Sequence, residues 1–255
     1  MFAAVLFDLD ETLIPDEPVS RHAFRITALE LTGDEARATE LGEAAFREAV
    51  SLWQELPSLA ADYGMRIGHS AIEGLWATYD PSIPAEAMLE RELTRIRPEV
   101  WRRALATCGL KGDPDQLQRR WQKLRSRFPL FEDTDELLAR LRPHTKLALV
   151  TNGVAGLQRR KVNGSGLLHW FDAVAISGER GVGKPDPAIF TWVCDQLGVP
   201  PSRCVMVGDN PERDVQGGSN AGMATAWIDR SHKARGVKAD VDARSLIELL
   251  PWLRK

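Results

Sequence analysis

The apolar positions near the start of the chain form a short continuous run, residues 3–7, that ends at an aspartate. A run this short, bounded by polar residues, is typical of a strand buried on both faces. From about residue 19 to residue 128, apolar residues recur instead every three or four positions, as at Leu117, Trp121 and Leu124. That spacing places side chains on one face of a helix. We therefore expect a block of several helices here.

Beyond residue 129 the pattern alternates between short apolar runs and helical spacing. The runs predict strands at residues 146–151, 173–177, 203–207 and 224–228. Strands that alternate with helices at this spacing favour a parallel sheet with right-handed crossovers. A polar stretch, residues 230–243, then leads to a last apolar run, residues 246–253, which we expect to form a surface helix.

Capping and breaking residues suggest where several helices begin and end. Asp186, followed by a proline, predicts a helix start, and Gly198 predicts the end of that helix. Asp133, with a glutamate three residues later, resembles a capping box at the start of another helix. Within the helical block, glycines and prolines such as Gly64 and Pro98 are expected to separate neighbouring helices.

This order of elements predicts one α/β core that is interrupted after its first strand. The expected fold class is α/β, a doubly wound, Rossmann-like parallel sheet with an inserted α-helical cap domain. The core would comprise residues 1–15 and 129–255, and the cap residues 16–128. Prolines lie at both crossings, which fits short linkers between domains.

Composition narrows the function classes without naming one. The 255 residues are 44% hydrophobic and 27% charged, with a net charge of −3, so no basic excess points to nucleic acid or an anionic membrane. The three cysteines form no CxxC pair, which argues against a zinc site or a disulfide framework. Without a signal peptide or a membrane-length apolar run, we expect a cytoplasmic protein, either a monomer or a homodimer.

Polar side chains follow four of the predicted strands. In open parallel sheets, ligands bind beyond the carboxyl ends of the strands. Several carboxylates gathered there would repel one another, and a divalent cation is the simplest resolution. Oxygen ligands without histidine or cysteine select magnesium. The residues concerned are Asp8, Asp10, Thr12, Thr151, Asn152, Lys184, Asp209 and Asp214.

Such a set of groups has a natural use in phosphoryl transfer. One carboxylate can attack phosphorus and form an aspartyl phosphate. A second carboxylate, two residues on, can protonate the leaving oxygen and later activate water. The metal and the lysine can neutralise charge on the transferring group, and backbone amides in glycine-flanked turns can hold phosphate oxygens.

The four sequence motifs resemble those of the haloacid dehalogenase superfamily, and they occur in the same order. Each follows a predicted strand, and the helical block resembles the cap that one branch of that family inserts after its first strand. Within that branch, the Thr151-Asn152-Gly153 turn and the stretch from Asp209 to Gly222 are similar to those of nucleoside monophosphatases and acylneuraminate phosphate phosphatases. The motifs are Asp8-Leu9-Asp10-Glu11-Thr12, Val150-Thr151-Asn152-Gly153, Gly183-Lys184-Pro185-Asp186 and Gly208-Asp209-Asn210-Pro211-Glu212-Arg213-Asp214.

The resemblance implies roles for the four aspartates. Asp8 would be the nucleophile and a metal ligand. Asp10 would be the general acid and base and would also give its backbone carbonyl to the metal. Asp209 would bind the Mg²⁺ ion directly, and Asp214 would support the metal site.

The resemblance also implies the groups that hold the substrate. Lys184 would pair with the phosphate and the nucleophile. Thr151 would bind phosphate with the help of Asn152, and Thr12 is expected near the same site. Many relatives carry glycine where Glu11 stands here. Cap closure would exclude water during transfer.

The expected activity is magnesium-dependent hydrolysis of a small phosphorylated metabolite, such as a nucleoside monophosphate or a sugar phosphate. Three alternatives stay open: a phosphomutase, a haloacid dehalogenase, and a phosphate-ester-binding protein without turnover. Family members that cleave carbon–halogen bonds lack a carboxylate at the position of Asp10, so its presence favours phosphoryl transfer.

Overall fold

The computed structural model describes residues 2–230 and 238–254, so half of the polar stretch 230–243 lies outside the described residues. The chain forms two compact units. The α/β unit comprises Met1–Pro15 and Phe128–Lys255, and the helical unit comprises Asp16–Arg127. The sequence put Phe128 with the helical block. The residue belongs instead to the α/β unit, where its ring packs so closely on Gly164 that a Cβ there would collide with it.

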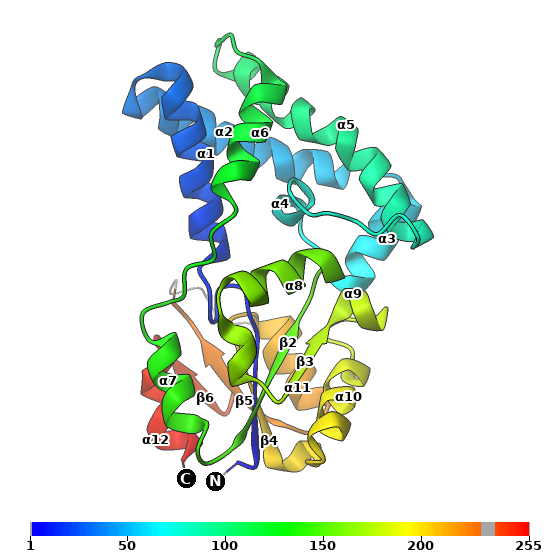
Figure 1. Cartoon of the computed structure of the whole chain (residues 1–255), viewed down its shortest axis with the longest axis vertical. Coiled ribbons are helices and arrows are strands. Elements are labelled where there is room, and N and C mark those ends of the chain that lie inside the picture. The colour runs from blue at the N-terminus through cyan, green and yellow to red at the C-terminus, as the bar shows by residue number, and fades with distance from the viewer. Residues whose placement is uncertain (1, 231–237, 255) are drawn as a thin grey trace. The chain divides into compact units, whose positions relative to one another are not determined.

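Six parallel strands form the sheet of the α/β unit (Figure 1). Their order is β3-β2-β1-β4-β5-β6, which is the doubly wound arrangement and confirms the predicted fold class. The four later strands that the apolar runs predicted are all present. The strands are β1 (Ala4–Phe7), β2 (Lys146–Thr151), β3 (Ala173–Ile176), β4 (Cys204–Gly208), β5 (Ala224–Ile228) and β6 (Val241–Ala243).

Helices cover both faces of this sheet, which explains why its strands are continuous apolar runs. Along β1, Val5 and Phe7 pack into one hydrophobic cluster, while Ala4 and Leu6 pack into another on the opposite face. The helical elements of this unit are α7 (Thr134–Leu141), α8 (Ala155–Gly164), η1 (Leu167–Trp170), α9 (Ser177–Arg180), α10 (Pro187–Leu197), η2 (Pro201–Arg203), η3 (Pro211–Gln216), α11 (Gly217–Asn220), η4 (Ile247–Leu249) and α12 (Leu250–Leu253).

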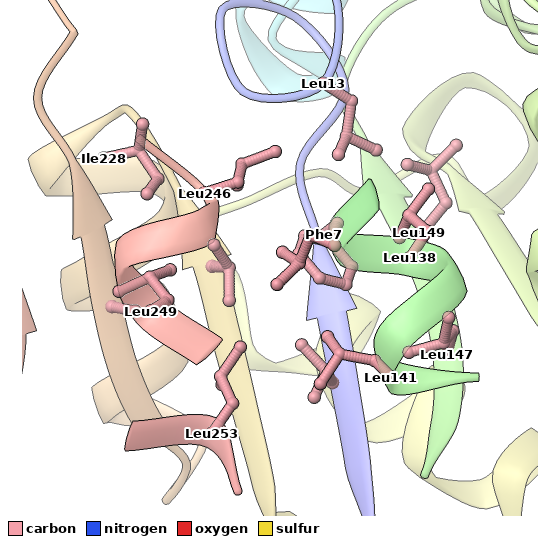
Figure 2. Close-up of a cluster of buried hydrophobic side chains, with 14 of the residues drawn as sticks. Phe7, Leu13, Leu138, Leu141, Leu147, Leu149, Ile228, Leu246, Leu249 and Leu253 are labelled. Carbon is pink, nitrogen blue, oxygen red and sulfur yellow. The ribbon is translucent and has the colours of Figure 1, made fainter. Parts of the chain in front are cut away.

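The C-terminal segment differs from the prediction of a surface helix. Its leucines at 246, 249 and 253 are buried and pack into the same cluster as Phe7 and Leu141 (Figure 2). The three- and four-residue spacing of these leucines therefore places them on a face that points into the core, not toward solvent. The strand β6, which the sequence did not predict, pairs with β5 just before this segment. Three residues with one aspartate among them carry too little pattern to mark a strand.

Both predicted helix starts are confirmed, but only one of the two expected side-chain caps forms. Asp186 accepts a hydrogen bond from the Ala188 amide, and Gly198 ends α10 at φ +64°. Asp133 precedes α7 but makes no side-chain capping bond. Its carboxylate accepts instead from the Arg230 guanidinium and the Leu246 amide, and so joins three parts of the α/β unit.

The helical unit consists of helices alone, as its periodicity predicted. Phe24, Trp101 and Trp121 form the aromatic part of its core, with the phenylalanine ring centroid 5.5 Å and 4.8 Å from the two tryptophan rings. Its helices are α1 (Asp16–Thr32), α2 (Glu35–Gln54), α3 (Ser58–Ile67), α4 (Ala71–Gly74), α5 (Pro84–Thr107) and α6 (Pro114–Leu124).

Two residues expected to break helices lie inside them. Pro98 is internal to α5, where it lacks an N–H for one bond of the helix. Gly64 is internal to α3, and a Cβ there would lie 3.0 Å from Trp53 Cζ2, so the glycine permits close packing. Among the described residues, no helix combines the length and apolar content needed to cross a bilayer.

Candidate active site

The predicted site residues follow strands that are neighbours in the sheet. Asp8 comes directly after β1, and its amide donates to the Val207 carbonyl of β4 at 2.9 Å. Thr151 ends β2, on the other side of β1. Asp209 follows β4. The chain runs from β1 to β2 on one side of the sheet and from β4 to β5 on the other, so the strand order reverses between β1 and β4, which is where doubly wound sheets bind ligands.

Three carboxylates converge at this edge. Carboxylate oxygens of Asp8, Asp209 and Asp214 all lie within 4.8 Å of one another. Asp214 comes from η3 and approaches so closely that any Cβ on Gly208 would collide with its carboxylate. The backbone N–H of Asn210 fixes Asp214 by donating to its Oδ2 at 3.0 Å. Among the described residues, these three form the acidic cluster, and the Asp10 carboxylate is not part of it.

A single buried ammonium lies among these carboxylates. Lys184 Nζ is 2.6 Å from Asp8 Oδ1 and 2.6 Å from Asp214 Oδ1. The Asn152 amide fixes the lysine backbone: its Nδ2 donates to the Lys184 carbonyl, and its Oδ1 accepts from the Lys184 N–H, both at 2.8 Å. Asn152 therefore positions Lys184, whereas the sequence placed it among the substrate-binding groups, a role that stays a prediction.

Burial and crowding strongly affect proton binding in the cluster. Burial, together with the charges of Asp8, Asp214 and Glu11, raises the pKa of Asp209 to about 8. Burial raises the pKa of Asp214 to about 6, although Lys184 opposes the shift. For Lys184 itself burial lowers the pKa, but the two carboxylates outweigh it, so its pKa lies above the ordinary value. Without a further cation, the cluster holds its negative charge at a cost.

Two threonines lie at the same edge. Thr151 Oγ1 is buried and has no hydrogen-bond partner among the described residues, which is unusual for a buried hydroxyl. A ligand oxygen would satisfy it. Thr12 Oγ1 points at Asp8 Oδ2 from 3.5 Å, at the upper limit for a hydrogen bond.

The Asp10 carboxylate has partners of its own. Both of its oxygens lie 2.9 Å from Lys161 Nζ, and Gln158 Nε2 donates to Oδ2 at 3.4 Å. The sequence prediction missed both partners. A signal for them was available in the sequence. Gln158 and Lys161 are three residues apart, so they share one face of α8, the helix that follows the Thr151-Asn152-Gly153 turn.

A family model described as a haloacid dehalogenase-like hydrolase matches residues 2–222. The chain belongs to the haloacid dehalogenase-like hydrolases. It is 40% identical to a phosphoserine phosphatase of Thermus thermophilus over 94% of each chain. It is also 39% identical to the N-acylneuraminate-9-phosphatase of Rattus norvegicus, over 54% of this chain and 58% of that one.

Solved structures of the same family share the fold. The magnesium-bound HAD-hydrolase YfnB of Bacillus subtilis superposes with a TM-score of 0.61 at 22% identity, over 100% of this chain and 99% of that one. With phosphatases among its relatives, this haloacid dehalogenase-like hydrolase is a phosphoric monoester hydrolase, which confirms the enzyme class that the sequence predicted.

The acidic cluster of this hydrolase has the chemistry of a magnesium site. When all three carboxyl groups are ionised, they and the one ammonium carry a net charge of −2, which one divalent cation neutralises. All the donors are oxygens, which hard cations such as Mg²⁺ prefer. Asp8, Asp209 and Asp214 are the residues that would hold it.

Proposed function

We propose that this protein is a magnesium-dependent phosphatase that hydrolyses a small phosphate monoester through a phosphoaspartate at Asp8. One observation carries the proposal. Asp8, Asp209 and Asp214 converge within 4.8 Å, and Lys184 contacts two of them. This arrangement supports the proposal, because the proposed nucleophile, the proposed cation ligands and a buried ammonium lie at one edge of the sheet.

In the first step, an oxygen of the Asp8 carboxylate attacks phosphorus, and the bond between phosphorus and the ester oxygen breaks. Asp10 gives the leaving oxygen its proton. Lys184 and the Thr151 hydroxyl bind the phosphoryl oxygens as charge builds up on them. When bound, Mg²⁺ neutralises phosphoryl charge and lowers the repulsion between the ester and Asp8.

In the second step, water attacks phosphorus of the phosphoaspartate, and Asp10 accepts a proton from that water. The bond between phosphorus and the Asp8 oxygen breaks, which releases inorganic phosphate and restores the carboxylate. The same side chain thus serves as acid first and base second. Its protonation state after the first step suits it for the second.

The proposed substrate is a small phosphorylated metabolite. Phosphoserine is the first candidate, because the phosphoserine phosphatase relative matches this chain over nearly its whole length. Sugar phosphates and nucleoside monophosphates follow. The helical unit is the proposed cap that selects among them. Dehalogenation is disfavoured, because the carboxylate of Asp10 has a use in protonating an ester oxygen and none in releasing a halide.

The test is phosphate release from a panel of esters, with and without Mg²⁺, by the native protein and by Asp8→Asn. The panel contains phosphoserine, sugar phosphates, nucleoside monophosphates and 4-nitrophenyl phosphate. The proposal predicts release that requires Mg²⁺ and disappears in the variant. Undiminished release by the variant, or release without any divalent cation, would overturn it.

A further inference from the structure

Lys161 is a fully buried lysine whose charge the proposed chemistry does not use. Its side chain is 0% exposed, and its ammonium lies 2.9 Å from each oxygen of Asp10. An ammonium buried in this way is costly unless a carboxylate pairs with it closely. A lysine on a helix can usually reach water at little cost. The placement of Lys161 therefore points to a specific task at Asp10.

Gln158, one turn earlier on α8, links this ion pair to the turn after β2. Its Nε2 donates to the Asn152 carbonyl at 2.7 Å and to Asp10 Oδ2 at 3.4 Å. The amide packs against Gly153, where a Cβ would lie only 2.5 Å from Nε2. Gly153 also adopts a φ of +135°, which favours glycine. The turn is thus shaped to admit the Gln158 side chain.

The Asp10 carboxylate needs such support because of its place in the chain. Asp10 lies in the turn after β1, next to Glu11, whose φ is +60°. The side chain of Asp10 is 27% exposed. Contact with both oxygens restricts rotation of the carboxyl group as well as of the side chain. The positive charge also offsets repulsion from the acidic cluster nearby in the chain. Two donors from one rigid helix can hold the carboxylate in a single orientation.

We propose that Lys161, assisted by Gln158, is a positioning residue that fixes the orientation of the Asp10 carboxylate for proton transfer. This inference rests on the proposed function, in which Asp10 protonates the leaving oxygen. A misplacement of about 1 Å in a reacting group can cost about 100-fold in rate. A misaligned general acid slows only the departure of a leaving group that needs a proton. Lys161 should therefore matter most for esters of alcohols.

The test compares single-turnover rates of Lys161→Met on two esters with Mg²⁺ present. One is the best alkyl phosphate of the panel. The other is 4-nitrophenyl phosphate, whose leaving group departs as the anion. We expect the alkyl ester to slow about 10- to 100-fold and the release of 4-nitrophenolate to slow less than about threefold, because general acid catalysis contributes about 100- to 10,000-fold. Gln158→Leu should show the same selectivity with a smaller loss.

Lys146→Met is the matched control, since its ammonium donates to the Leu197 carbonyl in the same unit and contacts no site residue. Mg²⁺ binding measured with the metal alone should be unchanged in all three variants. An equal loss on both esters, with a fully active native protein, would overturn the positioning role alone. A native protein that releases no phosphate would overturn the proposed function instead.

Discussion

The two units of the chain pair their buried charges differently. In the helical unit, Arg125 is 1% exposed and binds Asp16 at 2.6 Å, one cation to one anion. Glu86 accepts from the Tyr63 hydroxyl at 3.0 Å, and burial together with this carboxylate raises the pKa of the phenol, which keeps its proton. At the edge of the sheet, by contrast, three carboxylates share one ammonium.

This difference separates a balanced pair from an unbalanced cluster. The charges of Arg125 and Asp16 cancel, so this pair calls for no further ion. The acidic cluster instead carries an excess of negative charge, and Gly208 and the Asn210 backbone N–H hold its Asp214 carboxylate in place. Such an excess is stable only when a proton or a cation balances it. Titratable groups with strongly perturbed pKa values cluster at functional sites. Changes in the two units should therefore have different consequences.

The largest effect is expected at the nucleophile. Asp8→Asn should lower kcat by at least about 10,000-fold, as loss of a nucleophile does elsewhere. Its side chain keeps the size of aspartate, so the thermal unfolding midpoint should change little. Both are measured by phosphate release and calorimetry on the same preparation. A kcat within tenfold of the native value would contradict the role of Asp8.

Breaking the buried pair of the helical unit should act on stability. Arg125→Met leaves Asp16 without its 2.6 Å partner, at a cost of about 3 kcal/mol in the free energy of unfolding. Arg120→Met is the control, because its pair with Glu30 is solvent-exposed and should matter by less than about 1 kcal/mol. Denaturant unfolding measures both, and Mg²⁺ affinity should be unchanged. Equal losses in the two variants would contradict the distinction.

Metal affinity should depend on pH through Asp209. With a pKa of about 8, its carboxyl must lose a proton before Mg²⁺ binds, so affinity should rise by up to about tenfold per pH unit from 6 to 8. Isothermal titration with Mg²⁺ measures this. Asp209→Asn should bind the metal more weakly and with a flatter pH dependence. A flat profile for the native protein would contradict the raised pKa.

The same shift predicts the stability of the metal-free protein. The pKa of Asp209 is higher in the folded state than in the unfolded state, so the folded state binds the extra proton. The resulting stabilisation is complete below about pH 4 and is lost as the pH rises to about 8. Saturating Mg²⁺ should remove the decline. Unfolding midpoints recorded across this range, with and without the metal, test the sign.

The smallest effect is expected at Glu11, whose φ of +60° favours glycine. Glu11→Gly should relieve about 1 kcal/mol of backbone strain and raise the unfolding midpoint by about 2 °C. Because Glu11 also raises the pKa of Asp209, its loss should shift the pH dependence of Mg²⁺ affinity to lower pH. Glu11→Ala removes the charge but keeps the strained backbone, so it should share only this shift in pH dependence.

The sequence predicted the strands β1 to β5 and the polar residues that follow them, because a buried strand and a polar turn each leave a local pattern. Asp8, Lys184, Asp209 and Asp214 indeed meet at one edge. Lys161 was missed, because a lysine on a helix is ordinarily on the surface and its burial depends on a residue 151 positions away.

Other differences have the same origin. Asn152 was expected near the substrate, but the backbone of Lys184 occupies both ends of its amide. The leucines of the last segment have the spacing of a helix, and spacing alone cannot say whether that face meets solvent or the sheet. These contacts join distant parts of the chain, so no local pattern reveals them.

The most direct test of the account is capture of the phosphorylated enzyme. The native protein is mixed with ³²P-labelled phosphoserine, or with the best ester of the panel, and Mg²⁺, then quenched in acid within milliseconds and digested. The account predicts label on the peptide that contains Asp8, with no such label in Asp8→Asn or without the metal. Rapid phosphate release with no labelled peptide at any quench time, or with the label on another residue, would contradict it.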